Sequence, residues 1–270
     1  MLSHIWFDVD NTLYQMVGTR LEARIFNEMY NAVLDKRAAL NPHFQAQLAE
    51  LEKKESNSLS AVGKILAALE KIYDGLYYGD ESKGIEGLDS HSRVFAALGL
   101  ERKLANDAYN KPNIPEYVGR EPRLVGLFAY FDIIDMPYSL YSNNHASTVD
   151  PVLEKLGLKP TNFKIRIYGD AYPKGMGDEG FGVIIAQSNV APPNILFVGD
   201  RPSVDLRPAR QQGMKTALVT WPERNQSDQD MRIRIPYSKK TYADYTLENG
   251  PYGIKEIVDS LLRPGRNTGL

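Results

Sequence analysis

Two carboxylates stand at the end of the first apolar run of the chain. Asp8 and Asp10 are separated by one residue and come directly after Ile5, Trp6 and Phe7. Successive side chains of a strand point to opposite sides, so a strand that continues to this point would direct both carboxylates to the same side. Two neighbouring anions at the end of a buried strand repel each other and lose hydration. Such a pair is tolerated when a cation lies between the groups, or when one of them takes part in a reaction.

The acidic pair has the residue types that phosphoryl transfer needs. The Asp8 carboxylate could attack a phosphoryl group and form an acyl phosphate. Asp10 could protonate the leaving oxygen and later activate water. Thr12 and the amides of the turn could hold the loop and the phosphate oxygens. Taken alone, however, the pair fits a capped turn after an edge strand better, because Asp and Asn favour turns.

Three further segments carry polar groups of complementary chemistry. Ser142 and Asn143 end an apolar run and offer a hydroxyl and an amide to a phosphate oxygen. Lys174 offers a point charge suited to a phosphate or a carboxylate. Asp200 ends another apolar run and suits a hard cation such as Mg²⁺, and Asp205 follows it at an expected helix start. Each segment alone also fits a turn, a solvated lysine or a helix cap.

Alternating strands and helices would bring these segments together. The apolar runs that predict strands are Ile5–Val9, Ile133–Tyr141, Phe163–Tyr168, Ile195–Val198, Thr216–Trp221 and, more weakly, Tyr242–Leu247. Helical spacing is found in Thr148–Leu156, Glu179–Ser188 and Val204–Gln212. This alternation predicts an α/β fold with a Rossmann-like, mostly parallel sheet. Ligands bind at the carboxyl ends of the strands in such sheets, so the polar strand ends, Gly169-Asp170 among them, should converge on one rim.

Residues 15–118 have a different pattern. Apolar residues recur at helical spacing in Arg20–Lys36, His43–Lys54, Ser60–Tyr73 and Ser90–Leu98, and no strand signal appears. The segment 77–88 is a Gly-rich loop, and we expect Tyr73, Tyr77 and Tyr78 to pack at a domain seam more than to stack on a base. The expected organisation is an α/β core of residues 1–14 and 119–270, with a helical domain of residues 15–118 inserted after the first strand.

The composition excludes several classes of function. Of the 270 residues, 43% are hydrophobic and 24% are charged, as in an ordinary soluble globular protein. The net charge of -2 provides no general attraction for nucleic acid or an anionic membrane. The absence of cysteine excludes disulfides, thiolate metal sites and a Cys nucleophile, and no apolar run approaches the roughly 18 residues of a membrane span. We expect a cytoplasmic protein that binds a small metabolite, with no nucleic acid polymer or membrane as partner; the sequence leaves a homodimer open.

Together, the motifs resemble those of the haloacid dehalogenase (HAD) superfamily. The signature of that family is D-x-D-x-T, then Ser or Thr, then Lys, and then Gly-Asp with a further Asp. The matching positions here are Asp8-Val9-Asp10-Asn11-Thr12, Ser142, Lys174, Gly199-Asp200 and Asp205. The helical insert after the first motif looks like the cap domain of that family, so the resemblance covers the whole chain.

The resemblance implies a role for each matching acid. Asp8 would be the nucleophile and a Mg²⁺ ligand. Asp10 would be the general acid and base, with its backbone carbonyl on the metal. Asp200 would be the third protein ligand of the metal, and Asp205 would support the site from behind these ligands.

The resemblance also implies which residues bind the substrate and which reaction follows. Ser142 and Lys174 would hold the phosphoryl group with Asn143 nearby, and Thr12 would belong to the same substrate site. One divalent cation and one Lys would offset three acids and a phosphate. The implied activity is Mg²⁺-dependent hydrolysis of a small phosphomonoester through an aspartyl-phosphate intermediate.

One branch of the family is more similar than others. The segment Phe7–Tyr14 looks like the D-N-T-L-Y variant of pyrimidine 5′-nucleotidase-like members, which implies a nucleoside 5′-monophosphate as substrate. That group has Lys-Pro at the third motif, whereas here Pro173 precedes Lys174 and Gly175 follows it. This departure weakens the assignment of a nucleotide substrate more than it weakens the assignment of a phosphatase, because the lysine itself is present.

Other interpretations remain open at this point. A phosphomutase would have to keep water from the acyl phosphate, and a phosphonate-cleaving enzyme would need an amine from the insert. A haloacid hydrolase would use Asp8 on a carbon–halogen bond, but a halide leaving group needs no proton, so Asp10 argues against it. A non-catalytic HAD-fold protein would bind a phosphorylated metabolite without turnover.

Overall fold

The computed structural model describes residues 1–16, 19–55, 59–80, 83, 85–88, 90–169, 171–174, 179–221 and 241–262. These residues form two compact units. With the gaps just given, the first unit comprises the described residues within 1–16, 114–221 and 241–262, and the second comprises those within 19–113. From the sequence we expected the divisions between the units at 14/15 and 118/119. Asp170 and Gly175, which belong to the expected motifs, lie outside the described residues.

The first unit is built on a six-stranded parallel sheet in the order β5-β4-β1-β6-β7-β8. The strands are β1 (His4–Phe7), β4 (Tyr138–Tyr141), β5 (Arg166–Ile167), β6 (Ile195–Gly199), β7 (Lys215–Val219) and β8 (Tyr245–Leu247). The chain passes from β1 outward to β4 and β5, and then crosses to β6 on the other side of β1. This topology confirms the predicted α/β fold. The reversal of direction lies between β1 and β6, and in such sheets ligands bind at the carboxyl ends of the strands at this point.

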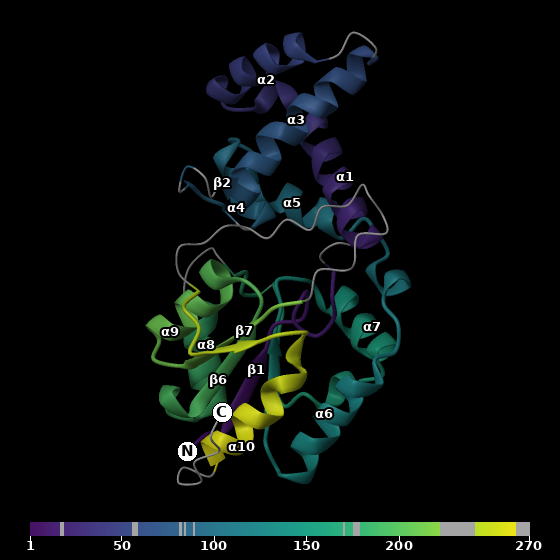
Figure 1. Cartoon of the computed structure of the whole chain (residues 1–270). Helices are drawn as coiled ribbons and strands as arrows, with labels where there is room; N and C mark the ends of the chain where they lie inside the picture. Colours follow the sequence, from purple (N-terminus) through teal and green to yellow (C-terminus); the bar gives the residue numbers. More distant parts are fainter. Residues whose placement is uncertain are drawn as a thin grey trace. The chain divides into compact units, whose positions relative to one another are not determined.

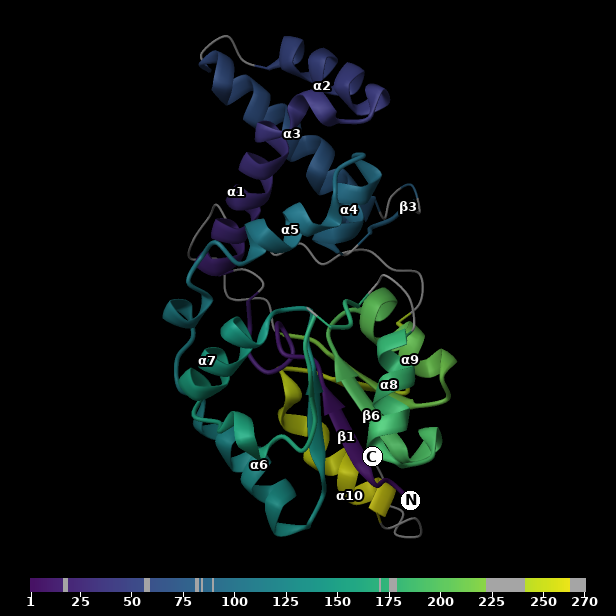
Figure 2. The ribbon, with the colours of Figure 1, turned by 180° about the vertical axis from the view of Figure 1, so that it is seen from behind.

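Helices cover both faces of this sheet, as Figure 1 shows and Figure 2 confirms from behind. Helices α6 (Pro122–Ile133) and α7 (Ala146–Leu156) lie on one face, and α8 (Glu179–Ser188) and α9 (Arg207–Gln211) lie on the other. Helix α10 (Ile254–Leu262) lies beside α6, where the Tyr130 hydroxyl donates to Asp259 Oδ1 at 2.5 Å. Among the described helices, none is both long and apolar enough to cross a bilayer.

Strand β1 is fixed from both faces just before the acidic pair. Phe7 packs on Phe128 of α6, with ring centroids 5.3 Å apart. Trp6 points to the opposite face, where its indole N–H donates to Ser188 Oγ of α8 at 2.9 Å. All four residues of the strand are buried, as expected for a parallel strand covered on both faces. The position of Asp8, the next residue, therefore depends on packing on both sides of the sheet.

The second unit is helical but also contains a short hairpin. Its elements are α1 (Arg20–Asp35), α2 (Pro42–Lys54), α3 (Ala61–Tyr78), β2 (Gly79–Asp80), β3 (Ile85–Glu86), α4 (His91–Ala97) and α5 (Arg102–Tyr109). The expectation of an insert without strands was wrong, because β2 and β3 pair antiparallel. Gly79 ends α3 with φ +75°, and a Cβ at Gly87 would lie 2.3 Å from the Tyr77 carbonyl oxygen. Two glycines thus accommodate the backbone at the two ends of this hairpin, which periodicity does not reveal.

The tyrosines that the sequence singled out pack around Phe26 within this second unit. Ring centroids of Tyr77 and Tyr78 lie 5.3 and 5.7 Å from that of Phe26, and the ring of Tyr73 lies 6.0 Å away. The Tyr73 hydroxyl also makes a 2.8 Å hydrogen bond with His91 Nδ1. These aromatic contacts give the helices of the second unit a core of their own.

Several boundaries expected in the first unit were wrong. The strand expected over Ile133–Tyr141 begins only at Tyr138, because α6 runs to Ile133 and Asp135 adopts a left-handed φ of +51°. The helix expected over Val204–Gln212 consists of a π-helical turn, Pro202–Leu206, followed by α9. Hydrophobic runs identify such elements but do not mark where a helix ends and the following strand begins.

Two glycines of α8 provide a paired test of its packing. A Cβ at Gly180 would lie 2.0 Å from the Tyr141 hydroxyl oxygen, whereas Gly182 is exposed with open space around it. We expect Gly180→Ala to lower the free energy of unfolding by about 1 to 3 kcal/mol through overpacking. Gly182→Ala should raise it by about 0.5 to 1 kcal/mol. Urea unfolding followed by tryptophan fluorescence checks both, since Trp6 and Trp221 lie in the first unit; equal effects would contradict the assigned contact.

His4 predicts a dependence of stability on pH. Its Nε2 bonds to Ser139 Oγ at 2.8 Å, and burial, with a smaller effect of Lys164, lowers its pKa to about 4. The unfolded chain therefore binds more protons than the folded one as the pH falls from about 6.5 towards about 4. We expect the folded state to lose stability on the order of 2 kcal/mol across this window, relative to a His4→Gln variant. Urea unfolding of both proteins at several pH values provides the comparison, and parallel curves would exclude the effect.

Candidate functional site

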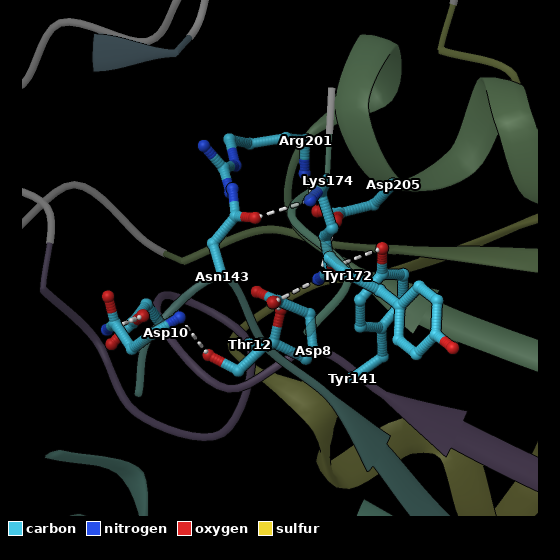
Figure 3. A network of polar contacts seen from close by, with 11 residues as sticks. Asp8, Asp10, Thr12, Tyr141, Asn143, Tyr172, Lys174, Arg201 and Asp205 are labelled. Carbon is cyan, nitrogen blue, oxygen red and sulfur yellow. Dashed lines mark hydrogen bonds and ion pairs between the residues drawn. The ribbon is translucent and has the colours of Figure 1, made fainter. Parts of the chain in front are cut away.

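A buried ammonium group joins two carboxylates at the carboxyl ends of the central strands (Figure 3). Lys174 Nζ donates to Asp8 Oδ1 and also to Asp205 Oδ1, the second at 2.9 Å. The side chains of Lys174 and Asp205 are fully buried, and that of Asp8 is 3% exposed. Charges are buried this completely only when they are paired, because each alone would lose its hydration.

The lysine is held in place by neighbours on several segments. Its backbone N–H donates to Asn143 Oδ1 at 2.6 Å. Its ammonium lies 4.9 Å from the ring centroid of Tyr141 and 5.5 Å from that of Phe197. The Tyr141 hydroxyl donates in turn to the carbonyl of Tyr172, two residues before the lysine, at 2.8 Å. Residues at the end of β4 thus hold the backbone and the ammonium group of the lysine, and Phe197 of β6 lies near the ammonium group.

A third carboxylate completes a compact acidic cluster. Asp8, Asp200 and Asp205 each offer an oxygen, and these oxygens all lie within 4.8 Å of one another. Asp205 Oδ2 accepts from the backbone N–H of Arg201 at 3.1 Å. Gly199 leaves the space for this arrangement, since a Cβ there would lie 2.7 Å from the Asp205 Cβ.

Burial and charge oppose each other in this cluster. Burial raises the pKa of Asp8 to about 6, although the ammonium of Lys174 lowers it. Burial likewise raises the pKa of Asp200, with Arg201 acting in the opposite direction. For Lys174, burial acts to lower the pKa, but the carboxylates of Asp205 and Asp8 outweigh it, and the result is a raised pKa. The lysine is therefore charged. The acids around it outnumber the positive charges that contact them.

The donor set fits a divalent magnesium ion. Asp200 Oδ1 is buried and has no hydrogen-bond partner among the described residues, so it is an acceptor without a donor. The cluster supplies three carboxylates and neither sulfur nor imidazole. Mg²⁺ prefers oxygen ligands of this kind, and a cation would remove the penalty of the unpaired buried oxygen. Asp8, Asp200 and Asp205 are therefore the residues that could hold it.

Asp10 lies outside this cluster. Strand β1 ends at Phe7, and Asp10 lies three residues beyond it, directly before the turn at residues 11–13. The Asp10 carboxylate instead accepts from the Tyr14 hydroxyl at Oδ1 and from Asn144 Nδ2 at Oδ2, the latter at 2.7 Å. Both oxygens of Asp10 thus have neutral donors from the same region of the first unit.

The remaining predicted residues lie around the lysine–acid contact. Thr12 Oγ1 donates to Asp8 Oδ2 at 3.3 Å, and Ser142 Oγ accepts from the backbone N–H of Asn144 at 3.1 Å. Thr12 and Ser142 are both fully buried. The structure therefore connects Thr12 directly to Asp8, and it connects Ser142 to the donor of Asp10.

Three residues that contact the site received no role in the sequence analysis. Asn144 and Tyr14 bind Asp10, and Tyr141 lies below Lys174. Asn144 adjoins the Ser142-Asn143 motif, and Tyr14 lies four residues after Asp10, so adjacency offered a weak signal for both. Nothing in the sequence distinguishes Tyr141 from other strand tyrosines.

The buried ammonium makes a test of stability possible without any ligand. Lys174→Met leaves Asp8 and Asp205 buried without their cation, and we expect it to destabilise the first unit by about 3 to 5 kcal/mol. Lys255→Met removes an exposed pair with Asp259 at 2.9 Å and should change stability by less than about 1 kcal/mol. Unfolding in urea, followed by tryptophan fluorescence, measures both. Similar losses in the two variants would refute the idea that the Lys174 contacts are the stronger ones.

Known proteins share this architecture. Residues 178–243 match a family model described as HAD-hydrolase-like, and the comparison with curated proteins finds no match. The chain is similar to a HAD phosphatase from Thermococcus onnurineus (TM-score 0.51, 16% identity, 95% of this chain and 98% of that one). It is also similar to a β-phosphoglucomutase from Clostridium difficile (TM-score 0.51, 13% identity, 97% and 100%). A third similar structure is a haloacid dehalogenase-like family hydrolase from Streptococcus pneumoniae (TM-score 0.51, 16% identity, 95% and 98%). The chain therefore has the fold of the HAD-like hydrolases.

Proposed function

We propose that this protein is a Mg²⁺-dependent phosphomonoester hydrolase that works through an aspartyl phosphate on Asp8. The observation that carries the proposal is the buried Lys174 ammonium between Asp8 and Asp205, beside the unpaired oxygen of Asp200. This group of charges is expensive to bury, and apolar side chains of similar size would fill the same space without that cost. A phosphoryl group and a divalent cation would make use of each of them.

In the proposed first step, a carboxylate oxygen of Asp8 forms a bond to phosphorus while the bond to the leaving oxygen breaks. Lys174, in contact with Asp8, would stabilise the charge on the phosphoryl oxygens. Ser142 accepts from Asn144 N–H, so its own hydroxyl hydrogen remains available to a phosphoryl oxygen. Thr12 would keep Asp8 in the orientation for attack through its bond to Oδ2.

Asp10 would handle the protons of both steps. It would donate a proton to the leaving oxygen, and then take one from the water that attacks phosphorus, releasing phosphate and restoring Asp8. Its carboxylate accepts from Tyr14 and Asn144, so one of these hydrogen bonds must be exchanged when Asp10 turns to the substrate. The two neutral donors would hold it ready between turnovers.

A bound Mg²⁺ would supply charge neutralisation, drawing phosphoryl oxygens and the Asp8 carboxylate together despite their like charge. Asp8, Asp200 and the backbone carbonyl of Asp10 are our proposed protein ligands. Asp205, which bonds to both Lys174 and Arg201, would hold the lysine in place and support the ligands. Its carboxylate also lies close enough to the other two to take part directly.

For the substrate, we propose a small phosphorylated metabolite, with nucleoside 5′-monophosphates as the first class to test. The support is the resemblance of the segment Phe7–Tyr14 to nucleotidases, and the Pro173-Lys174-Gly175 order weakens it. Solved structures of the same fold include a phosphatase and a phosphomutase. The fold alone therefore does not choose between hydrolysis and transfer, and a test has to separate the two.

We expect wild-type protein with Mg²⁺ to release phosphate from at least one member of a panel of phosphomonoesters. Asp8→Asn should abolish release, because an amide is a poor nucleophile, and Asp10→Asn should lower kcat by about 100- to 10,000-fold. A chelator should remove the activity and added Mg²⁺ should restore it. Incorporation of ¹⁸O from labelled water into phosphate distinguishes hydrolysis from phosphoryl transfer.

Asp150→Asn is the matched control for these variants. Asp150 lies on α7 and pairs with Arg166 at 3.0 Å and Tyr168 at 2.7 Å, outside the acidic cluster. It should retain wild-type kcat. The absence of phosphate release from the whole panel, or equal activity of Asp8→Asn and wild type, would refute the proposed function.

A further inference from the structure

A tryptophan of the first unit binds the loop that carries the acidic pair. The indole N–H of Trp221 donates to the carbonyl oxygen of Asn11 at 2.6 Å. We propose that Trp221 is a positioning residue, which sets the geometry of the nucleophile loop, defined here as residues 8–14, for phosphoryl transfer. This inference rests on the proposed function of the same site.

The nucleophile loop has hydrogen bonds of its own and receives a further one from Trp221 at the Asn11 carbonyl. The N–H groups of Thr12 and Leu13 both donate to the carbonyl of Val9, at 3.2 and 2.9 Å. Asn11 has a left-handed φ of +55°, which Asn tolerates better than most residues. Its side-chain Oδ1 accepts from the N–H of Met16 at 2.7 Å. The Asn11 carbonyl is thus the acceptor that Trp221 reaches from outside the loop.

The indole is held at the edge of the sheet by its own neighbours. Trp221 follows β7, and the preceding residue, Thr220, is bound to β8 through its N–H and the Leu247 carbonyl at 2.9 Å. Gly250 has φ +92°, and a Cβ there would lie 2.6 Å from indole carbons of Trp221. Tyr252 packs edge-on at 6.2 Å. The donor is therefore supported by β7, β8 and the turn after β8.

Fixing the Asn11 carbonyl also fixes the group that contacts the nucleophile. The carbonyl of Asn11 and the N–H of Thr12 belong to one planar peptide group. The Thr12 side chain donates to Asp8 Oδ2 at 3.3 Å, so rotation of this peptide would move the hydroxyl that orients Asp8. Displacement of a reacting group by about 1 Å can lower a rate by about 100-fold. A hydrogen bond at the back of the loop can thereby affect the reaction without touching the substrate.

The two tryptophans allow a matched comparison. Trp221→Phe removes the donor to Asn11, and Trp6→Phe removes an equivalent indole bond, to Ser188 at 2.9 Å, in the core. We expect Trp221→Phe to lower kcat by about 10- to 100-fold with KM nearly unchanged. Trp6→Phe should lower the melting temperature more, because Trp6 is fully buried, and should lower kcat less than Trp221→Phe does, because a phenyl ring keeps part of the packing that holds β1.

A spectroscopic measurement tests the same link without turnover. In the Trp6→Phe protein, Trp221 is the remaining tryptophan of the two in the chain. Mg²⁺ with beryllium fluoride, a phosphoryl mimic, should shift the emission of Trp221, since the indole is bonded to the loop that would bind the mimic. The shift should disappear when Asp8→Asn is added.

The outcomes separate this inference from the proposed function. Active wild-type protein whose Trp221→Phe variant keeps its kcat, or loses no more than Trp6→Phe, overturns the role of Trp221 and leaves the hydrolase standing. Inactive wild-type protein with an Asp8-dependent shift of Trp221 emission overturns hydrolysis and supports the coupling of Trp221 to the loop. Absence of both activity and emission shift overturns both.

Discussion

One buried ammonium group, that of Lys174, determines how the acidic residues of this protein can be arranged. It contacts Asp8 and Asp205 in a region from which water is excluded, and its own backbone N–H is bonded to Asn143. Removal of this cation would leave carboxylates buried without compensation, which proteins seldom tolerate. Three segments therefore have to stay in fixed positions relative to Asp8: the residues up to Lys174, the end of β4 and the turn after β6.

The fold meets this requirement through the order of its strands. Asp8 follows β1 and Asp200 follows β6, its direct neighbour in the sheet, while Ser142 and Asn143 follow β4 on the other side. Parallel strands bring all these positions to one edge. Phe7 and Trp6 anchor β1 to opposite helical layers, so the strand beneath the nucleophile is constrained from both faces. The ends of β1 and β6 thus place Asp8 and Asp200, while Lys174 and Asp205 reach them from the segments between the strands.

The sequence was sufficient for those features that depend on residue type at strand ends. Parallel strands that end in Asp8 and Asp200 predict a shared rim, and the structure brings these carboxylates within reach of each other. The hydrogen-bond partners of Asp10 were not predicted: they are Tyr14, four residues on, and Asn144, 134 residues away. The hairpin β2–β3 depended on glycine conformations, and the bond from Trp221 to Asn11 spans 210 residues. Local patterns contain no information about such contacts.

Gly199 has a consequence for how this site can change over evolutionary time. The side chain of Asp205 occupies the volume that a Cβ at position 199 would need. A mutation at position 199 would therefore be harmful as long as Asp205 is present, and tolerable only after residue 205 had moved or had lost its Cβ, which makes the closest contact. Such a change at 205 would first remove a partner of Lys174. The two positions can thus be altered in only one order, residue 205 first and residue 199 second. The intermediate would have an incompletely paired lysine. Sequences with a side chain at position 199 are therefore hard to reach from the present one.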